Sequence, residues 1–490
     1  MASKSDTKPT PNTPKPSTNK KKRQIKNQTT TSNTPAVTIS NYPSALKWLY
    51  THNDFERQRV VHYNPTEFSL DRMRNLLRFM GEPHQQLRFV HVAGTKGKGS
   101  VTAMVASMLQ SAGYTIGTYT SPHLTDLRER IQINGQLISH AALTETFKTV
   151  KAAAKQLEEG KPTFFEIMTA AAFQHFADEA VDLVILETGM GGRLDSTNVV
   201  DPELSVITEI SLDHTHILGD SLDKIAAEKA GIIKPETPVL TMVQDVAVET
   251  VFKQIAEQHN APITIVGKDI DFTHRFEANR ELGPHSRICL TTPHHTYDHV
   301  PVPLKGEHQA RNCALAIAVA DKLQQLGFKA EEEKLIEGLA ATKLPGRMEM
   351  VWTEPRITID GAHNPASLAA LMKSLGPHIP FDSLVLIFGC GQDKDIPAML
   401  EEIKLGADKV IFTRAKGNPR AAEPADLLAA FNAAEGKMAQ MAPTLEAALS
   451  LAARAVGRED LICVTGSFYL AGEAKKYLTE LAANKSKQNA

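Results

Sequence analysis

The chain has 490 residues, of which 42% are hydrophobic, and a formal net charge of −2, a composition typical of a globular protein with two or three domains. No apolar run approaches the roughly 18 to 20 residues that cross a bilayer, and no signal-peptide pattern opens the chain, so we expect a cytoplasmic protein with no membrane partner. The four cysteines lie too far apart for a CxxC pair, and we expect them to be reduced and in or near the core.

Residues 1–36 are rich in Lys, Thr, Pro, Asn and Ser and contain no Leu, Phe, Tyr or Trp, which predicts a disordered tail. Seven lysines and Arg23 outweigh the single Asp6, so the tail carries +7 and the remaining chain carries −9. An acidic body disfavours specific nucleic-acid binding, although the Lys20–Arg23 cluster could contact polyanions. A transit peptide is the alternative, but arginine is almost absent and no apolar helical face is present.

From Leu87 onward, short apolar runs alternate with helical patterns, as in βα units with a mainly parallel sheet. The strands predicted in this first series are Phe89–Ala93, Thr115–Tyr119, Leu183–Leu186, Leu204–Thr208, Val239–Met242 and Ile263–Val266. The helices predicted between them include Ser139–Leu157, Thr163–Phe176, Leu222–Gly231 and Val248–His259. Polar segments within Lys268–Val302 predict a small β-rich element before a helix over Gly306–Leu326.

Pro345 and Gly346 interrupt a helical pattern in Leu344–Arg347, and we interpret this segment as a domain hinge. A second α/β series follows it. The predicted strands are Arg356–Asp360, Leu384–Phe388, Lys409–Thr413 and Leu461–Val464, and the predicted helices are Pro365–Leu375, Ile396–Lys404, Pro424–Ala434 and a last one near Ala471–Leu478. The sequence therefore predicts an N-terminal P-loop-type domain with an open, mainly parallel sheet over residues 37–343 and a smaller Rossmann-like α/β domain over residues 344–490.

The segment Phe89–Ala106 joins a buried-strand pattern, a glycine-rich turn and a helix start, which is where a triphosphate would bind. The candidate nucleotide-binding residues of this turn are Gly94, Thr95, Gly97, Lys98, Gly99 and Ser100. Lys98 would reach the β- and γ-phosphates, and the Ser100 hydroxyl would bind Mg²⁺. Gly99 separates these two residues, unlike the usual Walker pattern, and the alternative is an ordinary glycine-rich turn.

Two more predicted strands end in polar residues at the carboxyl edge of the sheet, where open α/β sheets bind ligands. One ends in Glu187, which could share Mg²⁺ with Ser100. The next ends in a cluster that contains Asp213, His214 and His216. The alternatives are a surface glutamate and hydrogen-bonded structural histidines.

Several motifs along residues 40–480 point to one family. They are GTKGKGS (Gly94–Ser100), SPHL (Ser121–Leu124), ETGMGGRLDSTN (Glu187–Asn198), DHTHILG (Asp213–Gly219), AEKAGIIK (Ala227–Lys234), GEHQARN (Gly306–Asn312), LPGRME (Leu344–Glu349) and DGAHNP (Asp360–Pro365). With them the chain resembles the folylpolyglutamate synthase/dihydrofolate synthase family of the Mur ligase superfamily. It departs from the family at Lys96, where asparagine is common.

The resemblance implies an ATP-dependent amide ligase that uses ATP and Mg²⁺. A carboxylate of a pteroate or folate would attack the γ-phosphate, and the amine of L-glutamate would then displace phosphate from the acyl phosphate. These small molecules are the implied partners, and we expect a monomer. Addition of the first glutamate to dihydropteroate, extension of folate tails and both activities stay open, and we favour both.

The resemblance also implies roles for single residues. Lys98 would act on the phosphates, His214 would contribute to a second metal site, and Lys229 would be the lysine that such ligases carbamylate, with a surface lysine as the alternative. Asn312 and Arg347 would contact the nucleotide, Asp360 would lie beside its ribose or adenine, and His363 would organise the glutamate and phosphate side. The substrate candidates are Ser121, Pro122, His123 and Arg130 near the pterin and Ser467 near the glutamate.

Three of these residue roles have structural alternatives. Arg347 could cap the hinge, Asp360 could cap the helix that begins near Pro365, and the Ser-Pro pair could form a turn. Three competing functions stay open as well: a Mur-type ligase for cell-wall precursors, a scaffold protein on a degenerate ligase fold, and a polyanion-binding protein that uses the basic tail. The SPHL and GMGGRLDSTN segments favour the folate branch, and the retained polar residues disfavour the scaffold.

Overall fold

The structure is a computed structural model that describes residues 37–55, 69–158, 160–436 and 438–488. The expectations for residues 1–36 concern a segment outside this range. The described residues from Thr38 onward belong to one compact unit. None of the helices in the described part of the chain is long and apolar enough to span a membrane.

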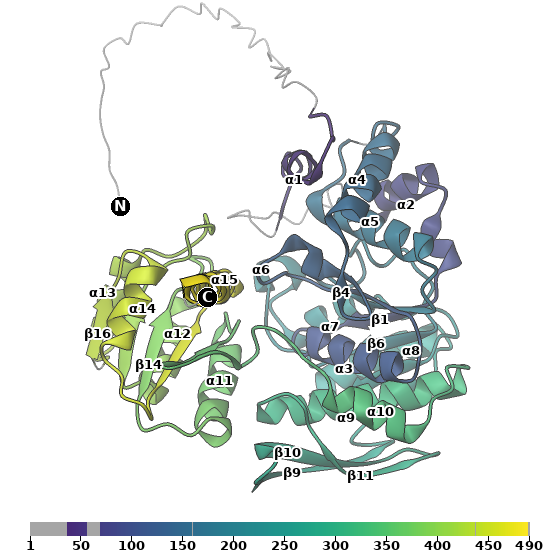
Figure 1. Cartoon of the computed structure of the whole chain (residues 1–490). Coiled ribbons are helices and arrows are strands. Elements are labelled where there is room, and N and C mark those ends of the chain that lie inside the picture. The colour runs from purple at the N-terminus through teal and green to yellow at the C-terminus, as the bar shows by residue number, and fades with distance from the viewer. Residues whose placement is uncertain (1–36, 56–68, 159, 437, 489–490) are drawn as a thin grey trace, which may run out of the picture. The chain divides into compact units, whose positions relative to one another are not determined.

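An eight-stranded sheet with the order β4-β3-β2-β5-β1-β6-β7-β8 confirms the first predicted series (Figure 1). Its strands are β1 (Phe89–Ala93), β2 (Ile116–Tyr119), β3 (Ile131–Ile133), β4 (Gln136–Leu137), β5 (Leu183–Glu187), β6 (Leu204–Ile207), β7 (Val239–Met242) and β8 (Ile263–Val266). The central strand β1 pairs in parallel with β5 and β6, and every residue of β1 and β5 is buried. Burial on both faces explains why these strands are continuous apolar runs in the sequence.

The helices of this part are α1 (Tyr42–Leu49), α2 (Leu70–Phe79), α3 (Lys98–Ser111), α4 (His140–Ala154), α5 (Phe164–Asp178), α6 (Thr215–Leu218), α7 (Leu222–Ala230) and α8 (Val246–Gln258), with short 3₁₀ turns η1 (Pro83–Gln86) and η2 (Leu127–Arg130). Ser139 and Thr163, which begin two predicted helices, are N-caps: their hydroxyls accept the backbone N–H groups of Ala142 and Glu166. The sequence analysis missed α1, α2 and the antiparallel strands β3 and β4.

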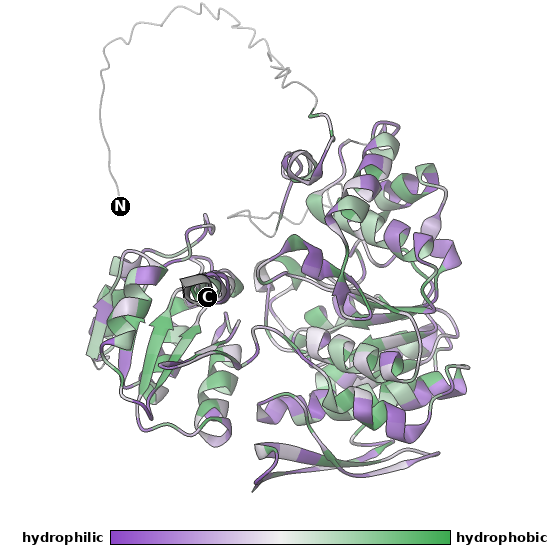
Figure 2. Ribbon diagram, viewed as in Figure 1, coloured by the Kyte–Doolittle hydropathy of each residue, from purple (hydrophilic) through white to green (hydrophobic). Residues whose placement is uncertain are grey.

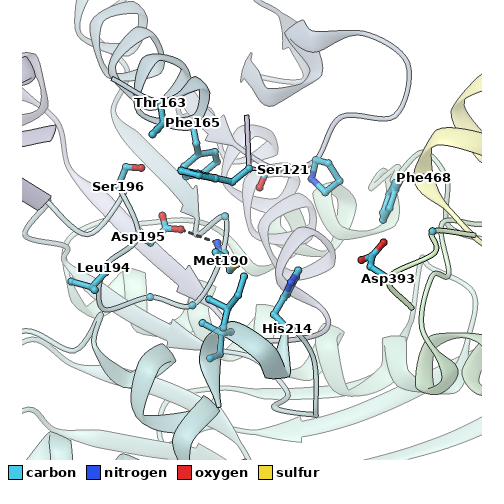
Figure 3. A pocket seen from close by; sticks show the side chains of 18 of the residues that line it. Ser121, Thr163, Phe165, Met190, Leu194, Asp195, Ser196, His214, Asp393 and Phe468 are labelled. Carbon is cyan, nitrogen blue, oxygen red and sulfur yellow. Dashed lines mark hydrogen bonds between the residues drawn. The ribbon is translucent and has the colours of Figure 1, made fainter. Parts of the chain in front are cut away.

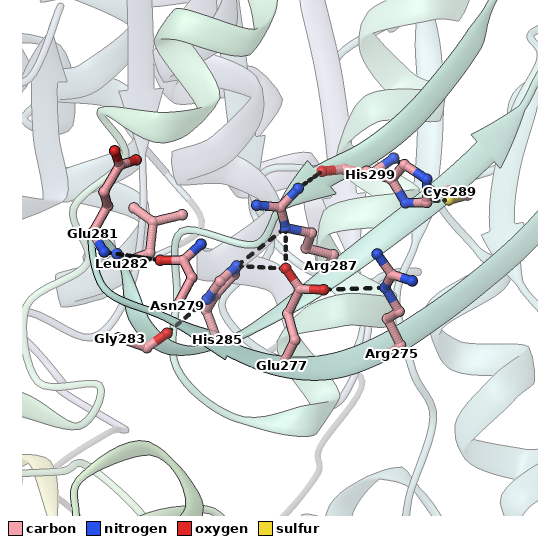
Figure 4. Close-up of polar contacts among 10 residues, drawn as sticks. All are labelled: Arg275, Glu277, Asn279, Glu281, Leu282, Gly283, His285, Arg287, Cys289 and His299. Atoms are coloured by element: carbon pink, nitrogen blue, oxygen red, sulfur yellow. Dashed lines mark hydrogen bonds and ion pairs between the residues drawn. The ribbon is translucent and has the colours of Figure 1, made fainter.

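The predicted β-rich element is a three-stranded antiparallel sheet of β9 (Asp271–Asn279), β10 (Gly283–Thr291) and β11 (Thr296–Pro301). One face carries a polar cluster, in which Glu277 forms ion pairs with Arg287 and Arg275 (Figure 4). The other face contributes Ile288 and Leu290 to the core that it shares with α9. Helices α9 (Glu307–Gln325) and α10 (Glu332–Ala340) follow.

The second predicted series is a six-stranded sheet with the order β12-β13-β17-β14-β15-β16. Its elements are β12 (Glu349–Thr353), β13 (Arg356–Ile359), α11 (Pro365–His378), β14 (Leu384–Phe388), α12 (Ile396–Gly406), β15 (Lys409–Phe412), α13 (Pro424–Ala433), β16 (Met438–Met441), α14 (Leu445–Ala453), β17 (Leu461–Thr465) and α15 (Phe468–Gln488). We call this set of elements, residues 349–488, the C-terminal layer. The sequence analysis missed β12, β16 and α14, and it placed the start of α15 three residues late.

The C-terminal layer buries hydrophobic residues on both faces of its sheet, and Figure 2 shows hydrophobic residues along β14. Leu386 and Phe388 pack with residues of α11, α12 and α13. Val385 and Ile387 point to the opposite face and pack with α14 and α15. This alternation along β14 places the carboxyl ends of the strands between two helical layers, as in a ligand-binding α/β fold.

Candidate active site

The glycine-rich turn between β1 and α3 is held by its neighbours. Gly94 and Gly97 have backbone φ angles of 147° and 88°, which residues other than glycine rarely adopt. A Cβ atom at Gly94 would overlap the Thr208 hydroxyl, and one at Gly97 would overlap the side-chain amide of Asn312. Thr95 donates its backbone N–H to the Glu209 carbonyl at 2.9 Å, which fixes the turn against the segment that follows β6. The turn therefore needs glycine for packing as well as for ligand approach.

Lys98 and Glu187 lie together beneath this turn. The Lys98 ammonium donates to the Gly94 carbonyl at 3.1 Å and lies 3.8 Å from the Glu187 carboxylate. Glu187 ends β5 as a buried side chain, so the surface-glutamate alternative is wrong. Burial raises the pKa of Glu187 to about 7 although Lys98 and other cations nearby oppose this shift. Ser100 is buried in the first turn of α3.

The residues around Glu187 fit a magnesium ion that arrives with a nucleotide. Mg²⁺ prefers oxygen ligands and commonly binds one or two carboxylates together with substrate phosphates and water. Ser100 and Glu187 supply such oxygens, and a Cβ atom on the intervening Gly99 would lie only 3.6 Å from the carboxylate. In the described part of the chain, no group of three His, Cys, Asp or Glu residues could hold a metal by itself. A metal at His214 would therefore need ligands besides these side chains, so the second metal site stays a prediction.

Lys229 is buried on α7, and its ammonium donates to the Gly94 carbonyl at 2.8 Å. The interpretation as a surface lysine is therefore wrong. Burial and, second, the nearby Lys98 ammonium lower the pKa of Lys229 to about 7. Lys98 and Lys229 thus share one carbonyl acceptor, and a substantial fraction of Lys229 is a neutral amine at neutral pH.

Asp213, His214 and His363 form a second polar group. His214 adopts a left-handed conformation at the start of α6 and lines the cavity, where it is exposed to solvent and partial desolvation lowers its pKa. Burial opposes ionisation of Asp213, but His214, His363 and Lys394 together lower its pKa to about 2. His363 has Nδ1 2.9 Å from the Gly361 carbonyl. His214 and His363 line the same cavity.

Arg347 and Asp360 pack into one structural unit. The Arg347 guanidinium stacks on the Phe468 ring at 4.6 Å, and a Cβ atom at Gly361 would lie 2.8 Å from its Nη1. Both Asp360 oxygens accept backbone N–H groups, from Met348 at 2.9 Å and from Ala362 at 2.8 Å. Gly361 donates its N–H to the Gly346 carbonyl at 2.9 Å. These bonds join the LPGRME and DGAHNP motifs.

The N-cap of α11 is Asn364, whose side chain accepts the Ser367 N–H, so the proposed helix-capping role of Asp360 is wrong. Asn312 is buried against the phosphate turn and donates to the Gln309 amide oxygen at 3.0 Å. The SPHL segment and Arg130 also meet, because Arg130 Nε donates to His123 Nδ1 at 2.9 Å. Ser121, Pro122 and Ser467 line the cavity, but His123 and Arg130 do not.

A cavity of about 300 Å³ is lined by Ser121, His214, His363 and Ser467, whereas Lys98, Glu187, Lys229 and Arg347 are not among its lining residues. Figure 3 shows Phe165, Asp195 and His214 around it, with Asp393 and Phe468 from the C-terminal layer. Asp195 is buried and accepts the Met190 N–H at 2.8 Å, whereas Phe165 is an apolar part of the wall. The sequence analysis did not select Phe165 or Asp195, although Asp195 lies in the ETGMGGRLDSTN motif and Phe165 lies in the predicted helix Thr163–Phe176.

The sequence analysis also missed three charged residues of the cavity wall, Asp393, Lys394 and Arg420. One Asp393 oxygen lies 3.7 Å from Lys394 Nζ and 3.7 Å from Arg420 Nη1. The Arg420 Nε is buried and has no hydrogen-bond partner among the residues that the structure describes. These residues follow β14 and β15, so their position after two predicted strands was the available signal.

Comparisons with known proteins give two family-model matches and similar relatives over most of the chain. The family model for the Mur ligase middle domain matches residues 92–320, and the model for the Mur ligase, glutamate ligase domain matches residues 346–468. The dihydrofolate synthase/folylpolyglutamate synthase of Bacillus subtilis is 37% identical over 414 residues, which cover 84% of this chain and 94% of the relative. The Escherichia coli protein of the same name is 34% identical over 383 residues, which cover 77% and 83%.

Solved structures of similar proteins include Mycobacterium tuberculosis folylpolyglutamate synthase complexed with ADP and AMPPCP. It has a TM-score of 0.78 and 32% identity, and the match covers 84% of this chain and 95% of that chain. Escherichia coli FolC in complex with DHPP and ADP has a TM-score of 0.77 and 28% identity, and the match covers 90% and 99%. The fold and the order of the two matched regions are therefore those of these proteins.

Proposed function

Because the chain belongs to the folylpolyglutamate synthase/dihydrofolate synthase family of Mur ligases, we propose that it joins L-glutamate to the carboxylate of dihydropteroate, of reduced folates, or of both. The observation that carries this proposal is the convergence of Lys98 and Lys229 on the Gly94 carbonyl, at the turn beside buried Glu187. In this proposal, residues 37–343 bind ATP and the pteroate, and residues 344–490 supply the glutamate side.

In the first step, a substrate carboxylate oxygen attacks the γ-phosphorus of ATP, and ADP leaves. Lys98 is placed to stabilise the charge on the transferred phosphoryl group, and Arg347 is placed to hold the nucleotide. Ser100 and Glu187 would hold Mg²⁺, which neutralises phosphate charge. In the second step, the glutamate amine attacks the acyl carbon and inorganic phosphate leaves. His214, His363 and Phe468 line the cavity, and in this proposal they would limit access of water to the acyl phosphate.

The charges of Lys394, Asp393 and Arg420 are complementary to L-glutamate. In the cavity wall, the Asp393 carboxylate lies 3.7 Å from the cationic group of Lys394 and 3.7 Å from that of Arg420. Glutamate has the opposite order of charges, with an ammonium group and two carboxylates. The unpartnered Arg420 Nε has a hydrogen bond to give. We assign the two glutamate carboxylates to Lys394 and Arg420 and the ammonium to Asp393. The Phe165 and Asp195 side of the cavity would then receive the pterin, with the ring of Phe165 as a flat apolar contact.

We expect the purified protein to release ADP and phosphate in a glutamate-dependent reaction when ATP, Mg²⁺ and either dihydropteroate or tetrahydrofolate are supplied. Product masses measured separately for the two acceptors decide between the synthase activities. A cell-wall precursor is the matched competing acceptor. Amide product with this precursor, and none with any pteroate or folate from active protein, would reject the folate branch and leave the ligase reaction intact.

Removing either cation of the cavity wall should weaken glutamate binding. We expect Lys394→Ala and Arg420→Ala to raise the KM for glutamate by about 30-fold or more, because loss of a desolvated charge pair typically costs about 2 kcal/mol or more. The KM for ATP should change little. Lys416→Ala is a matched control from the loop that contains Arg420, since Lys416 is exposed and pairs with Glu446. Unchanged glutamate KM values in both cavity variants would place the glutamate elsewhere.

The remaining properties complete the proposal. The four cysteines are free thiols, three of them buried, and we propose a cytoplasmic, monomeric enzyme without a specific nucleic-acid partner. The Mur ligase models are shared with cell-wall ligases, but the relatives that cover most of the chain carry folate-synthase names, which favours the folate branch. Deletion of residues 1–36 with retention of ligase activity would separate polyanion binding by the tail from this function.

A further inference from the structure

The last residue of the SPHL motif lies in the core of the C-terminal layer. Ser121 and Pro122 line the cavity, whereas the Leu124 side chain packs against the hydrophobic cluster formed by the second sheet with α14 and α15. The Leu124 carbonyl lies against Gly472 of α15 so closely that a Cβ atom there would overlap the carbonyl oxygen and lie 2.9 Å from the carbonyl carbon. A segment of the first half of the chain is therefore fitted into the second.

The segment that presents Leu124 is held in one conformation. The Glu129 carboxylate accepts the backbone N–H groups of Leu124 at 2.6 Å, Thr125 at 2.9 Å and Asp126 at 2.9 Å. A carboxylate that accepts several N–H groups is a strong constraint on a turn, because each bond is charge-assisted. Leu124 also meets Gly346, where a Cβ atom would lie 3.2 Å from its methyl groups. Leu124 is therefore a rigid projection and not a loop residue that can adapt to a larger neighbour.

The position of Gly472 on α15 connects this contact to the cavity. Phe468 precedes Gly472 by four residues, so both lie on one face of α15. Phe468 lines the cavity and stacks on Arg347, and Ser467 precedes it in the cavity wall. Glycine destabilises a helix interior relative to alanine, so its presence at position 472 has a local cost that the close approach of Leu124 explains.

We propose that the Leu124–Gly472 contact is a positioning device for the second half-reaction, which sets the distance between the acyl group near Ser121 and the glutamate side of the cavity. This inference rests on the proposed function. The phosphate turn, Lys98 and Glu187 lie outside the contact, and formation of the acyl phosphate involves the C-terminal side through Arg347, whose neighbours Met348 and Gly346 are bonded to Asp360 and Gly361. We therefore expect this first step to depend on the contact much less than the second. Attack of the glutamate amine on the acyl carbon does depend on it, because Ser467, Phe468 and the cations of the wall belong to the C-terminal layer.

The test is a Gly472→Ala variant of the full chain, measured in two assays. The first assay omits glutamate and measures reversible acyl-phosphate formation. It detects the exchange of ¹⁸O between the β,γ-bridging position of ATP and the non-bridging positions of the β-phosphate. With saturating glutamate, amide product is followed by mass. We expect amide formation to fall at least 10-fold while isotope exchange stays within about threefold of the parent. Gly457→Ala is the matched control, because its Cβ atom would meet only Asp460 at 3.5 Å.

Equal loss of both rates, or an unchanged amide rate, would overturn the positioning role. Leu124→Ala provides a second variant that removes contact atoms without adding any, and the same selective loss is expected from it. It keeps the question decidable when Gly472→Ala does not fold. Failure of the proposed function has a different signature, since the parent protein would then form no amide with any pteroate or folate and the variants would have no rate to lose.

Discussion

Lys98→Ala should lower kcat by about 10²-fold or more while leaving the fold intact, which is the usual cost of removing one electrostatic contact to developing charge. The ammonium lies in the first turn of α3, 3.1 Å from the Gly94 carbonyl, and contributes little to the apolar core. Its loss also removes the cation that most opposes protonation of Glu187, whose pKa is already about 7. The variant therefore lacks the positive charge at the phosphates. A smaller fraction of its Glu187 side chains is also ionised at neutral pH than in the parent protein.

The measurement is steady-state kinetics of amide formation, together with circular dichroism to check the fold. Lys96→Asn is the matched control, because Lys96 lies in the same turn but is 4.0 Å from Glu209 and was not assigned to the nucleotide. It should retain activity within about threefold of the parent. A folded Lys98→Ala variant with nearly the parent rate would remove the phosphate assignment of this turn.

Lys229→Ala should be nearly inactive, and short carboxylic acids should partly restore it. We expect Lys229 to carry a carbamate, whose formation needs a neutral amine to react with CO₂. The burial that lowers the pKa of Lys229 to about 7 supplies that neutral amine at neutral pH. A carbamate would replace a cation by an anion next to the phosphate turn, where Mg²⁺ bound with the nucleotide stabilises it. Acetate or formate would occupy the space vacated in the alanine variant and supply the missing anion.

Lys229→Arg is the matched variant for charge, since it keeps a cation and fills the same space, and acids should not rescue it. Activity is measured with and without acid at constant ionic strength, and the mass of the intact nucleotide complex tests for the added CO₂. Full activity of Lys229→Ala without acid, or a free ammonium at position 229 in an active nucleotide complex, would refute the carbamate.

The strands of both sheets were predictable because burial on two faces makes them continuous apolar runs. Val239–Met242 and Leu384–Phe388 match β7 and β14 at both ends. The missed strands are of another kind: β12 and β16 lie at the edges of the second sheet, and three of the four residues of β16 are exposed. An edge strand with exposed side chains has neither an apolar run nor a clear alternation, so composition does not mark it.

The site was predictable where chemistry follows a strand directly, as at Lys98 and Glu187. The site was less predictable where residues that lie close together in the fold are far apart in the sequence. Lys229 is a buried donor to a carbonyl 135 residues away, and nothing in the AEKAGIIK segment by itself distinguishes burial from exposure. Lys394 directly follows Asp393 in the chain, but Arg420 lies after another strand and reaches Asp393 only through the parallel order of β14 and β15. Sheet order is a tertiary property that local patterns do not contain.

Asp360 and Gly361 form hydrogen bonds with residues 346–348. These bonds restrict the proline-glycine segment that the sequence analysis interprets as a hinge. Because Met348 and Gly346 are tied to Asp360 and Gly361, this stretch belongs mechanically to the sheet that follows it. Arg347 and His363 are then two points on one rigid body, and any motion of that body carries the guanidinium and the imidazole through the same rotation. Binding of a nucleotide by Arg347 would in this way also fix the orientation of the His363 imidazole.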